Sequence, residues 1–499
     1  MTRSVDAGDL VPVLDAIRAL AFVGDLSMGQ PVDHSTRTAW LAARIAEAAG
    51  RAAALSDADI NEATDAALCV ALLRWSGCTA NAPEFSTLLG DDVGGRDAML
   101  TTASAAEAAA FAAGVGEMAR IHCEVAGEIG HMLGLPAGVE RALRHVFENW
   151  NGQGTPAGLR GDEVPQAVYH VALAGDLEIF SRAHGLPAAL RQIAERADAK
   201  YPRALVALVT AQASIWLAAL DDGAHERDAP RVAMGETPLA LVADVIDLKL
   251  PWMTGLSRRV ADAARDAGAA LGLSTEEQAR LHRAGLLHGI GRASVPNALW
   301  NEGRRLGEAD RERLRLMPYW TGRAARRLVA LTEEAELASY VDERIDGSGA
   351  FRGVAGAAIP MSARVLAASA CWVHARTARP GHPALDLASA REALRAEAAA
   401  GKLDAAAVEA LCGAGSIPGP KPAQGAGSAA GLEPIALSAR EAEVLARIAV
   451  GDSNKEAARE LGISPSTVRT HLESAFRKLG CSTRAAATLK AMTLGLLAV

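Results

Sequence analysis

A concentration of basic side chains near the C-terminus stands out in an acidic chain. The segment 464–490 carries five basic residues and one acidic residue, which gives a local charge of +4. The basic residues are Arg469, Arg477, Lys478, Arg484 and Lys490, and the acidic one is Glu473. The whole chain of 499 residues has 51 basic and 59 acidic residues and a net charge of −8. A protein with this overall charge binds nucleic acid only through a local patch, and a positive patch is the footprint expected for phosphates.

Four short helices are predicted to position these side chains. Ser438–Glu441 and Ser453–Glu456 are capping boxes, in which the serine hydroxyl accepts from the third helical N–H and the glutamate reaches back. Ser464–Pro465 predicts the start of a third helix, because proline at the first helical position misses no hydrogen bond. A fourth helix is expected to start near Thr483. The turn at Gly462 gives the second and third helices the spacing of a helix-turn-helix.

The third of these helices is predicted to bury one face and expose the other. The apolar face carries Val468, Leu472, Phe476 and Leu479. The opposite face carries Ser466, Thr467, Arg469, Thr470, Glu473 and Arg477. An exposed helix with these donors and acceptors suits the major groove of duplex DNA. The alternative from the residues alone is a solvated helical bundle that binds another protein.

This C-terminal segment resembles the LuxR-type helix-turn-helix over nearly its whole length. The matching motifs are L-S-x-R-E-x-E-V-L, G-x-S-N-K-E-x-A, L-G-I-S-x-x-T-V-R-x-H and K-L-G. The resemblance implies that Arg469, Thr470 and Glu473 face base edges, where arginine can bridge a guanine and glutamate can accept from a cytosine amino group. It implies phosphate contacts for Lys455, Thr467 and Lys478, which position the domain without reading sequence. It also implies binding as a dimer with the last helix at the interface.

A change in composition separates this domain from the rest of the chain. Residues 413–434 read GAGSIPGPKPAQGAGSAAGLEP and contain almost no large apolar side chains. Such a segment cannot build a packed core, so we expect a flexible linker over 413–434, followed by the DNA-binding domain over 435–499.

The larger part before the linker contains a repeat. The segments Glu148–Gly154 and Glu343–Gly349 align at an offset of 195 residues. The same offset relates Gly158 to Gly353, Gly161 to Gly356 and Pro165 to Pro360. The alternative is two unrelated glycine-rich loops, but five small or constrained residues in one register favour a repeat. We therefore expect two similar modules, module 1 over residues 10–205 and module 2 over 235–400.

The two loops resemble the glycine-rich signature of the HD-GYP phosphohydrolases. They read WNGQGTPAGLRGDEVP and IDGSGAFRGVAGAAIP, and Leu287–Arg292 resembles the H-D-I-G-K motif of the same family. The resemblance implies helical modules in which His and Asp side chains hold two or three metal ions. A hydroxide that bridges the metals then attacks a phosphodiester.

Most of the metal ligands that this resemblance calls for are replaced in both modules. In module 1 the central His-Asp pair is Arg74–Trp75, and the paired histidines are Val146–Phe147. Module 2 keeps His288, but the following Asp is Gly289 and the last Asp is Ala370. The guanidinium of Arg74 cannot lose its charge and disfavours a dication beside it. We therefore expect no catalytic residue in either module.

Three polar residues of module 1 stay near ligand positions of that family. His34 and His122 fall at such positions, and Asp176 lies close to the last one, so a single weakly bound divalent metal is the residual candidate. The favoured alternative is that these three are polar side chains left over from an ancestral pocket, with no cofactor. His288 is expected to be structural or to touch a ligand, and Arg74 or Arg292 to meet an anionic ligand or to form an ordinary ion pair.

Composition predicts an all-α fold for the whole chain. Half of the residues are hydrophobic and only 4% are aromatic, and the apolar positions of 38–49 and 260–271 recur three and four residues apart. None of the six cysteines has C-x-x-C spacing, which disfavours a zinc knuckle. The sequence lacks the features of a secretion signal and an uninterrupted apolar run of about 18 residues, so we expect a cytoplasmic protein with no membrane partner.

Together these patterns predict a transcriptional regulator that binds double-stranded DNA as a homodimer. Its duplicated, inactive HD-like region is expected to sense a small-molecule effector or a partner, or to mediate dimerisation. The alternative is a metal-dependent HD-type phosphodiesterase with an accessory DNA-binding domain. A third hypothesis is a scaffold whose helix-turn-helix binds protein.

Overall fold

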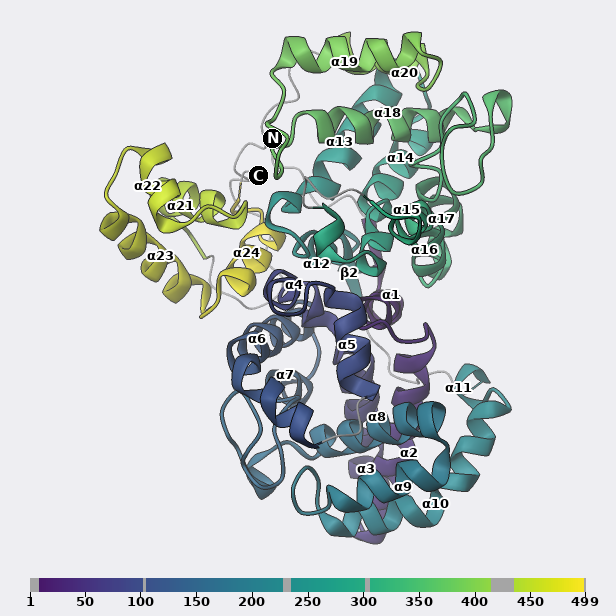
Figure 1. Cartoon of the computed structure of the whole chain (residues 1–499), viewed down its shortest axis with the longest axis vertical. Coiled ribbons are helices and arrows are strands. Elements are labelled where there is room, and N and C mark those ends of the chain that lie inside the picture. The colour runs from purple at the N-terminus through teal and green to yellow at the C-terminus, as the bar shows by residue number, and fades with distance from the viewer. Residues whose placement is uncertain (1–8, 102–104, 228–234, 301–305, 414–434, 498–499) are drawn as a thin grey trace. The chain divides into compact units, whose positions relative to one another are not determined.

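The computed structural model describes residues 9–101, 105–227, 235–300, 306–413 and 435–497, and Figure 1 traces them as mostly helix. They form two compact units. The N-terminal unit spans Pro12–Glu236, and the C-terminal unit comprises the described residues from Thr237 onward with the short segment before Pro12. The predicted all-α fold is confirmed. Among the described residues, only β1 (Leu10–Pro12) and β2 (Glu236–Pro238) pair as strands.

The N-terminal unit contains module 1 and continues beyond its expected end at residue 205. Its helices are α1 (Val13–Ser27), α2 (His34–Ala52), α3 (Asp57–Leu73), α4 (Ala82–Leu89), α5 (Asp92–Thr101), α6 (Ala105–Met132), α7 (Ala137–Arg144), α8 (Gln166–His184), α9 (Leu186–Glu195), α10 (Arg203–Asp221) and α11 (Ala224–Arg227).

Helices α2, α3 and α8 pack against one another at the centre of this unit. Leu41 and Ile45 of α2 and Val70 and Leu73 of α3 are fully buried, and burying each such side chain contributes about 1.5–3 kcal/mol. This packing brings the first residue of α2, the residue after α3 and the middle of α8 into one place. The candidate site of module 1 lies there.

The C-terminal unit contains module 2 and the C-terminal bundle. The helices of module 2 are α12 (Ala240–Asp247), α13 (Leu256–Ala270), α14 (Thr275–Leu287), α15 (Glu308–Arg315), α16 (Met317–Ala325), α17 (Thr332–Ala338), α18 (Met361–Ala375), α19 (Leu387–Ala399) and α20 (Ala405–Gly413). Helices α13, α14 and α18 pack together as α2, α3 and α8 do in module 1. Apart from Gly413, which ends α20, the expected linker 413–434 lies outside the described residues.

The predicted repeat has the same local geometry in both modules. Glu148 Oε1 accepts from the N–H of Ala157 at 2.7 Å, and Glu343 Oε1 accepts from the N–H of Arg352, 195 residues later, also at 2.7 Å. A Cβ on Gly154 would lie 2.3 Å from a backbone nitrogen, as would one on Gly349. Only glycine fits such a close approach of backbone to backbone. Each glycine-rich loop is therefore closely packed in its own module, and its glutamate accepts from the backbone of the loop.

The C-terminal bundle consists of α21 (Ala439–Ala449), α22 (Asn454–Leu461), α23 (Pro465–Leu479) and α24 (Arg484–Thr493). Both predicted capping boxes are present, with Ser438 Oγ accepting from Glu441 N at 3.3 Å and Ser453 Oγ from Glu456 N at 3.2 Å. Gly462 takes the left-handed conformation that ends α22. The caps and turns expected from the sequence are confirmed here.

Among the described residues one helix, α10, has the length and apolar composition of a membrane span, with a mean hydropathy of 1.6. By itself this is weak evidence of a span. One face of α10 carries buried residues, namely Leu205, Val206, Val209, Ala213, Trp216 and Leu220, and the helix packs against α2 and α9. In this structure α10 is therefore a partly buried helix of the N-terminal unit.

Candidate functional site

The guanidinium of Arg74 occupies the centre of module 1. Arg74 follows α3 and is only 4% exposed. Its Nη2 donates to His34 Nε2 and, at 3.4 Å, to Thr38 Oγ1, and its Nη1 donates to the carbonyl of Val171 at 3.5 Å. On the other side of the imidazole, His34 Nδ1 lies 2.5 Å from Glu178 Oε2. Arg74, His34 and Glu178 therefore form one buried chain of polar contacts.

The charges of Arg74 and Glu178 determine how His34 is protonated. Burial and the charge of Arg74 lower the pKa of His34. The neutral ring carries its proton on Nδ1, donates it to Glu178 and accepts from Arg74 through Nε2. Burial alone would raise the pKa of Glu178, but His34 and Arg182 outweigh burial and lower it to about 2. The chain thus places one fixed positive and one fixed negative charge on either side of a neutral histidine.

A glycine in α8 makes room for Arg74. A Cβ on Gly175 would lie 2.1 Å from Arg74 Nη1. The 195-residue offset relates Gly175 to Ala370, the position of the last metal-binding Asp in the HD-GYP resemblance. Module 1 has therefore exchanged two of the implied ligands together, since an arginine stands for a histidine and a glycine for an aspartate.

The other residual metal candidates of module 1 do not converge on His34. His122 donates through Nε2 to the backbone carbonyl of Arg74 at 2.7 Å. Asp176 accepts instead from Lys200 at 2.8 Å and from Tyr201 at 2.8 Å. No group of three or more His, Cys, Asp and Glu suited to a metal occurs among the described residues. With a guanidinium bound to His34, these residues do not fit a metal centre.

Module 2 has a similar centre built from different positions. Arg292 is 2% exposed, and its Nη2 donates to His288 Nε2 at 2.9 Å and to His374 Nε2 at 3.3 Å. His288 donates through Nδ1 to the carbonyl of Gly285 at 2.6 Å. Burial and the charge of Arg292 lower the pKa of His288 to about 3, so this ring is neutral at physiological pH.

Here too a glycine makes room for the arginine. A Cβ on Gly289 would lie 2.6 Å from Arg292 Nη1. Gly289 stands where the HD-GYP motif has its Asp, and Arg292 stands where that motif has its Lys. Arg292 leaves two buried nitrogens, Nε and Nη1, without a hydrogen-bond partner, whereas Arg74 leaves only Nε, and Nη1 of Arg292 lies 3.9 Å from Asp247 Oδ1. The arginine at the centre of module 2 therefore has more nitrogens without a hydrogen-bond partner than the arginine at the centre of module 1.

Sequence reasoning missed a buried aspartate in each module. Asp25 accepts from the N–H of Ser35 at 3.1 Å and from its hydroxyl at 2.6 Å. Asp247 accepts from the N–H and the hydroxyl of Ser257, both at 2.8 Å. Burial raises the pKa of Asp25 to about 7 and that of Asp247 to about 6, although the serines and the nearby arginines lower both. The signal in the sequence is the shared spacing of ten residues between Asp and Ser.

Two further site residues also escaped the sequence analysis. Glu178, rather than Asp176, is the α8 carboxylate that reaches His34. His374 of α18 reaches Arg292 across 82 residues of chain. Neither position carries a residue of the quoted family motifs, so no signal in the sequence pointed to them.

The predicted base-contacting side chains lie on the exposed face of α23. Arg469 and Glu473 are 75% and 62% exposed, and Arg469 Nε donates to Glu473 Oε1 at 2.7 Å. Thr470 is exposed and donates to the carbonyl of Ser466 at 3.1 Å. Val468 and Leu472 on the opposite face are buried. The helix thus offers duplex DNA a polar face that is accessible along its length.

The predicted phosphate contacts are placed less uniformly. Lys455 and Thr467 are exposed, and the hydroxyl of Thr467 lies 2.8 Å from that of Ser464. Lys478 instead donates to Glu441 Oε2 at 2.7 Å. Burial would raise the pKa of Glu441, but Lys478 and the capping contacts outweigh it and lower the pKa to about 2. Lys478 therefore holds α23 to α21.

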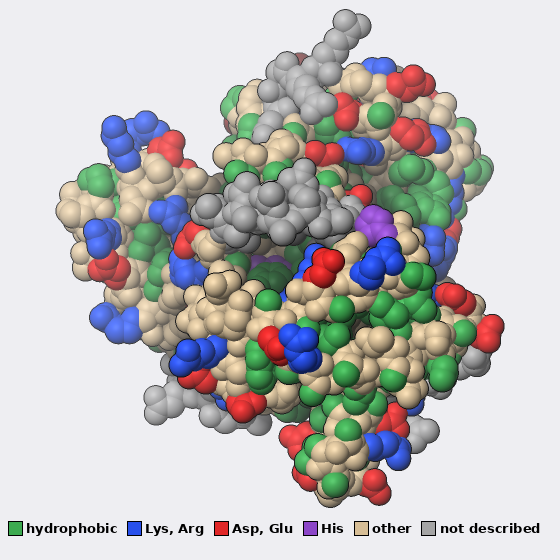
Figure 2. All heavy atoms as spheres, turned by 60° about the horizontal axis from the view of Figure 1, so that its bottom comes forward, with side chains coloured by type: hydrophobic (Ala, Val, Ile, Leu, Met, Phe, Trp, Pro, Cys, Tyr) green, Lys and Arg blue, Asp and Glu red, His purple; other side chains and the backbone are tan. Residues whose placement is uncertain are grey.

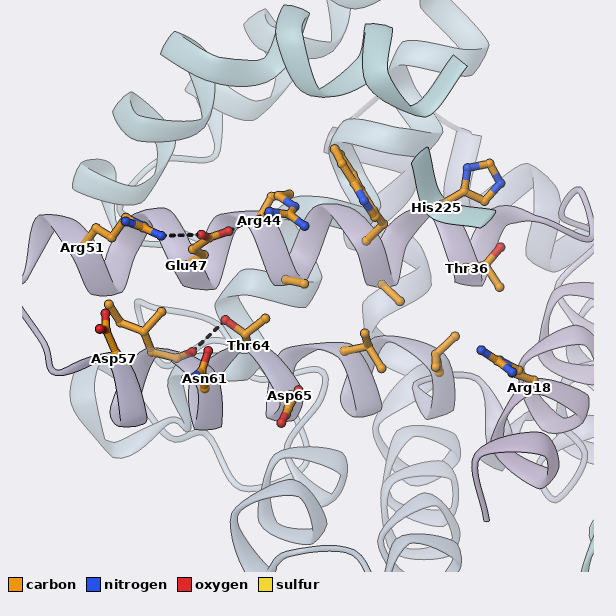
Figure 3. A pocket seen from close by; sticks show the side chains of 16 residues that line it. Arg18, Thr36, Arg44, Glu47, Arg51, Asp57, Asn61, Thr64, Asp65 and His225 are labelled. Carbon is orange, nitrogen blue, oxygen red and sulfur yellow. Dashed lines mark hydrogen bonds and ion pairs between the residues drawn. The ribbon is translucent and has the colours of Figure 1, made fainter. Parts of the chain in front are cut away.

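A separate groove of about 930 Å³ lies on the N-terminal unit between α2 and α3 (Figure 3). Its cationic side chains are Arg18, Arg44 and Arg51, and its carboxylates are Glu47, Asp57 and Asp65. Arg44 and Arg51 both pair with Glu47 at 2.8 Å. The balanced charges give this groove no preference for an anion or a cation.

Comparison with known proteins decides the family of two parts of the chain. Residues 240–407 match the family described as "HD domain", and residues 436–491 match "Bacterial regulatory proteins, luxR family". The chain contains an HD domain and a LuxR-type DNA-binding domain. The HD domain coincides with module 2, and the LuxR-type domain coincides with the C-terminal bundle. Both resemblances noted in the sequence are confirmed.

The relatives of the N-terminal and C-terminal regions differ. The 3′3′-cGAMP-specific phosphodiesterase 3 of Vibrio cholerae is 23% identical over 424 residues, which cover 76% of this chain and 90% of that protein. The probable transcriptional regulatory protein NarL of Mycobacterium tuberculosis is 55% identical over 64 residues, which cover 13% of this chain and 29% of NarL. A crystal structure of a cyclic GMP-AMP specific phosphodiesterase of V. cholerae matches with a TM-score of 0.56 and 20% identity, over 81% of this chain and 97% of that one. This last likeness shows the fold alone.

Proposed function

We propose that this protein is a cytoplasmic transcriptional regulator that binds double-stranded DNA, with two HD-like modules that do not catalyse hydrolysis. The exposed polar face of α23 in the LuxR-type domain carries the proposal. Arg469, Thr470 and Glu473 read base edges, and Lys455, Thr467 and Lys478 contact phosphates. Lys478 then exchanges its contact with Glu441 for a phosphate, or shares it between the two.

The buried arginines support the absence of catalysis. Arg74 places a permanent positive charge where the HD-GYP signature calls for a metal ligand, and Arg292, at the Lys position of the motif, donates to His288, the one ligand of that motif which module 2 keeps. The modules hold no cofactor in this proposal. They sense a small-molecule effector or a protein partner, or join two copies of the chain.

Genome-wide mapping of bound DNA tests the regulator. Arg469→Ala is expected to weaken binding about 5- to 150-fold at the preferred sites and to relax the preference at one base position. Arg459→Ala is the matched control, because Arg459 is 76% exposed on α22 and lies outside the reading face. Equal occupancy for Arg469→Ala and the wild type would contradict the assignment.

A second candidate function is a phosphodiesterase with an accessory DNA-binding domain. The similarity to the cGAMP-specific phosphodiesterase over 90% of that protein favours it. Metal analysis of the purified chain and incubation with 3′3′-cGAMP in the presence of Mn²⁺ or Fe²⁺ separate the two. A stoichiometric metal together with hydrolysis would support the enzyme and overturn the proposed inactivity. Absence of hydrolysis alongside retained DNA binding would support the regulator.

A further inference from the structure

The outer face of α10 is exposed along the whole helix and is mostly apolar, with the hydroxyls of Thr210 and Ser214 among small apolar side chains. Ile215 is 63% exposed, the largest exposed apolar side chain of this helix. Ala204, Ala207, Ala211, Ser214 and Ala218 are exposed beside it, and Leu208 is half-buried. The opposite face already packs in the N-terminal unit, so this face remains without a partner among the described residues. Figure 2 brings the end of the molecule at the bottom of Figure 1 forward and shows green hydrophobic side chains exposed over it.

The charges of α10 stand only at its two ends. Arg203 is its first residue and Asp221 its last, and no residue between them is charged. They lie 18 residues apart, which is about five turns of 3.6 residues, so both stand on the same side of the helix. Their side chains are 72% and 73% exposed. The exposed strip therefore has a positive end, a neutral middle and a negative end. When two such strips lie antiparallel, the positive end of each meets the negative end of the other.

We propose that α10 pairs antiparallel with α10 of a second copy of this chain. A two-fold axis at the level of residue 212 along the helix would place Arg203 of each copy beside Asp221 of the other. The same surface meets itself in such an interface, so charges must be absent from its centre, as they are here. The small side chains of Ala207 and Ala211 allow a close approach of the two helices, and Ile215 fills the space beside them.

The existing partners of the end charges do not oppose this pairing. Arg203 Nε lies 2.7 Å from Asp198 Oδ2, and Arg37 Nη2 lies 3.1 Å from Asp221 Oδ1. The pair of Arg203 with Asp198 is exposed on both sides and contributes little, so Arg203 exchanges or shares its partner at small cost. Arg37 is only 14% exposed, but Asp221 is 73% exposed and can accept from a second cation beside it. A single pair of helices buries less than the roughly 800 Å² per partner of a standard interface. We therefore expect a dimer with a dissociation constant in the micromolar range.

A lipid surface fits the same face less well. The exposed strip has no basic residue in its middle to attract anionic headgroups, and its opposite face is committed to the core of the unit. The proposed dimer gives a defined surface to one of the roles proposed for the modules, and its test does not depend on DNA binding, because self-association is measured without DNA or effector.

Sedimentation equilibrium of the full chain tests the dimer. Ile215→Glu would bury a carboxylate at the centre of the interface and is expected to weaken association at least about tenfold. Leu88→Glu is the matched control, because Leu88 is 50% exposed elsewhere in the same unit, and it should leave association unchanged. A wild-type chain that stays monomeric at about 100 µM would overturn the proposal. Equal association of Ile215→Glu and the wild type would overturn it as well.

Charge exchange tests the antiparallel orientation. Arg203→Asp alone places two acidic groups together at each end and should weaken the dimer. The double variant Arg203→Asp with Asp221→Arg restores opposite charges at both ends and should recover association. A double variant no better than the single one would contradict the proposed pairing.

Cysteine crosslinking tests the register. Ala211→Cys lies beside the proposed axis and should form a disulfide between copies on mild oxidation, seen by non-reducing electrophoresis. Ala204→Cys should not, because the two copies of residue 204 would lie about 24 Å apart at 1.5 Å per residue. Crosslinking of Ala204→Cys but not of Ala211→Cys would overturn the register. Sedimentation of the wild type with phosphatidylcholine vesicles, lost in Ile215→Glu, would assign the face to lipid instead.

Discussion

The arginines of the two HD-like modules and the arginine of the recognition helix lie in opposite environments. Arg74 and Arg292 are almost completely buried, and each donates to a neutral histidine. Arg469 is 75% exposed and is held by one glutamate on its own helix. The same side chain therefore serves in one region to bind buried acceptors and in the other to present donors to solvent. Burial, rather than charge, separates a structural arginine from one that can meet a ligand.

The largest expected effect is that of removing a buried arginine. Arg74→Leu leaves the buried acceptors of His34, Thr38 and Val171 without their donor and removes the positive charge that favours the buried Asp25 carboxylate, so it is expected to destabilise the N-terminal unit by about 3–5 kcal/mol. Amide hydrogen exchange in α2, α3 and α8 of the full chain measures this loss. Arg292→Leu should cost less in α13, α14 and α18, because two nitrogens of Arg292 lack a hydrogen-bond partner in the folded state, against one of Arg74. Equal losses would show that these unpaired groups do not matter.

A smaller effect is expected at the glycine that faces Arg74. Gly175→Ala brings a Cβ to 2.1 Å from Arg74 Nη1, and the resulting overpacking is expected to cost about 1–3 kcal/mol. In an Arg74→Leu background the guanidinium is gone, so the cost of Gly175→Ala should shrink. This double-mutant cycle, followed by exchange protection of α8, isolates the coupling between the two positions. Additive effects of the two substitutions would show that Arg74 and Gly175 are not coupled.

The pH dependence of stability is expected to differ modestly between the modules. Burial raises the pKa of Asp25 to about 7, whereas an unfolded Asp titrates near 3.9. The stability that this group contributes is complete below about pH 4 and is lost as pH rises through about 7. For Asp247 the loss should end near pH 6. Exchange protection between pH 4.5 and 8 measures both, and Asp25→Asn should remove the contribution of Asp25 from the N-terminal unit and leave that of Asp247 unchanged.

The smallest expected effect comes from Glu473 on the recognition helix. Glu473→Gln frees Arg469 and removes one negative charge from the DNA-facing surface. Binding to non-specific duplex DNA should strengthen about two- to fivefold at low salt, with a smaller change at high salt. Glu460→Gln on α22 is the control. A gel shift at two salt concentrations measures this change in affinity. A weaker complex of Glu473→Gln with DNA would show that Glu473 itself makes a favourable contact.

The sequence predicted the C-terminal bundle in more detail than the site of either module. Local signals fix a capping box such as Ser438–Glu441 within four residues of chain, and the structure contains it. The replacement of ligands by Arg74 and Gly289 was also readable from the motifs. The contact of Arg292 with His374 was not, because it depends on how two helices 82 residues apart pack together. Glu178 was missed for the same reason, since a shift of two residues along α8 changes which carboxylate faces the site.

The contacts of Glu441 have a consequence for how the LuxR-type domain meets its target. One carboxylate accepts from the backbone that starts α21, from Ser474 at 2.8 Å and from Lys478 at 2.7 Å, both on α23. The recognition helix is thereby oriented before any encounter with DNA. A preorganised reading surface loses little conformational entropy on docking, so more of the contact energy remains for discrimination between bases.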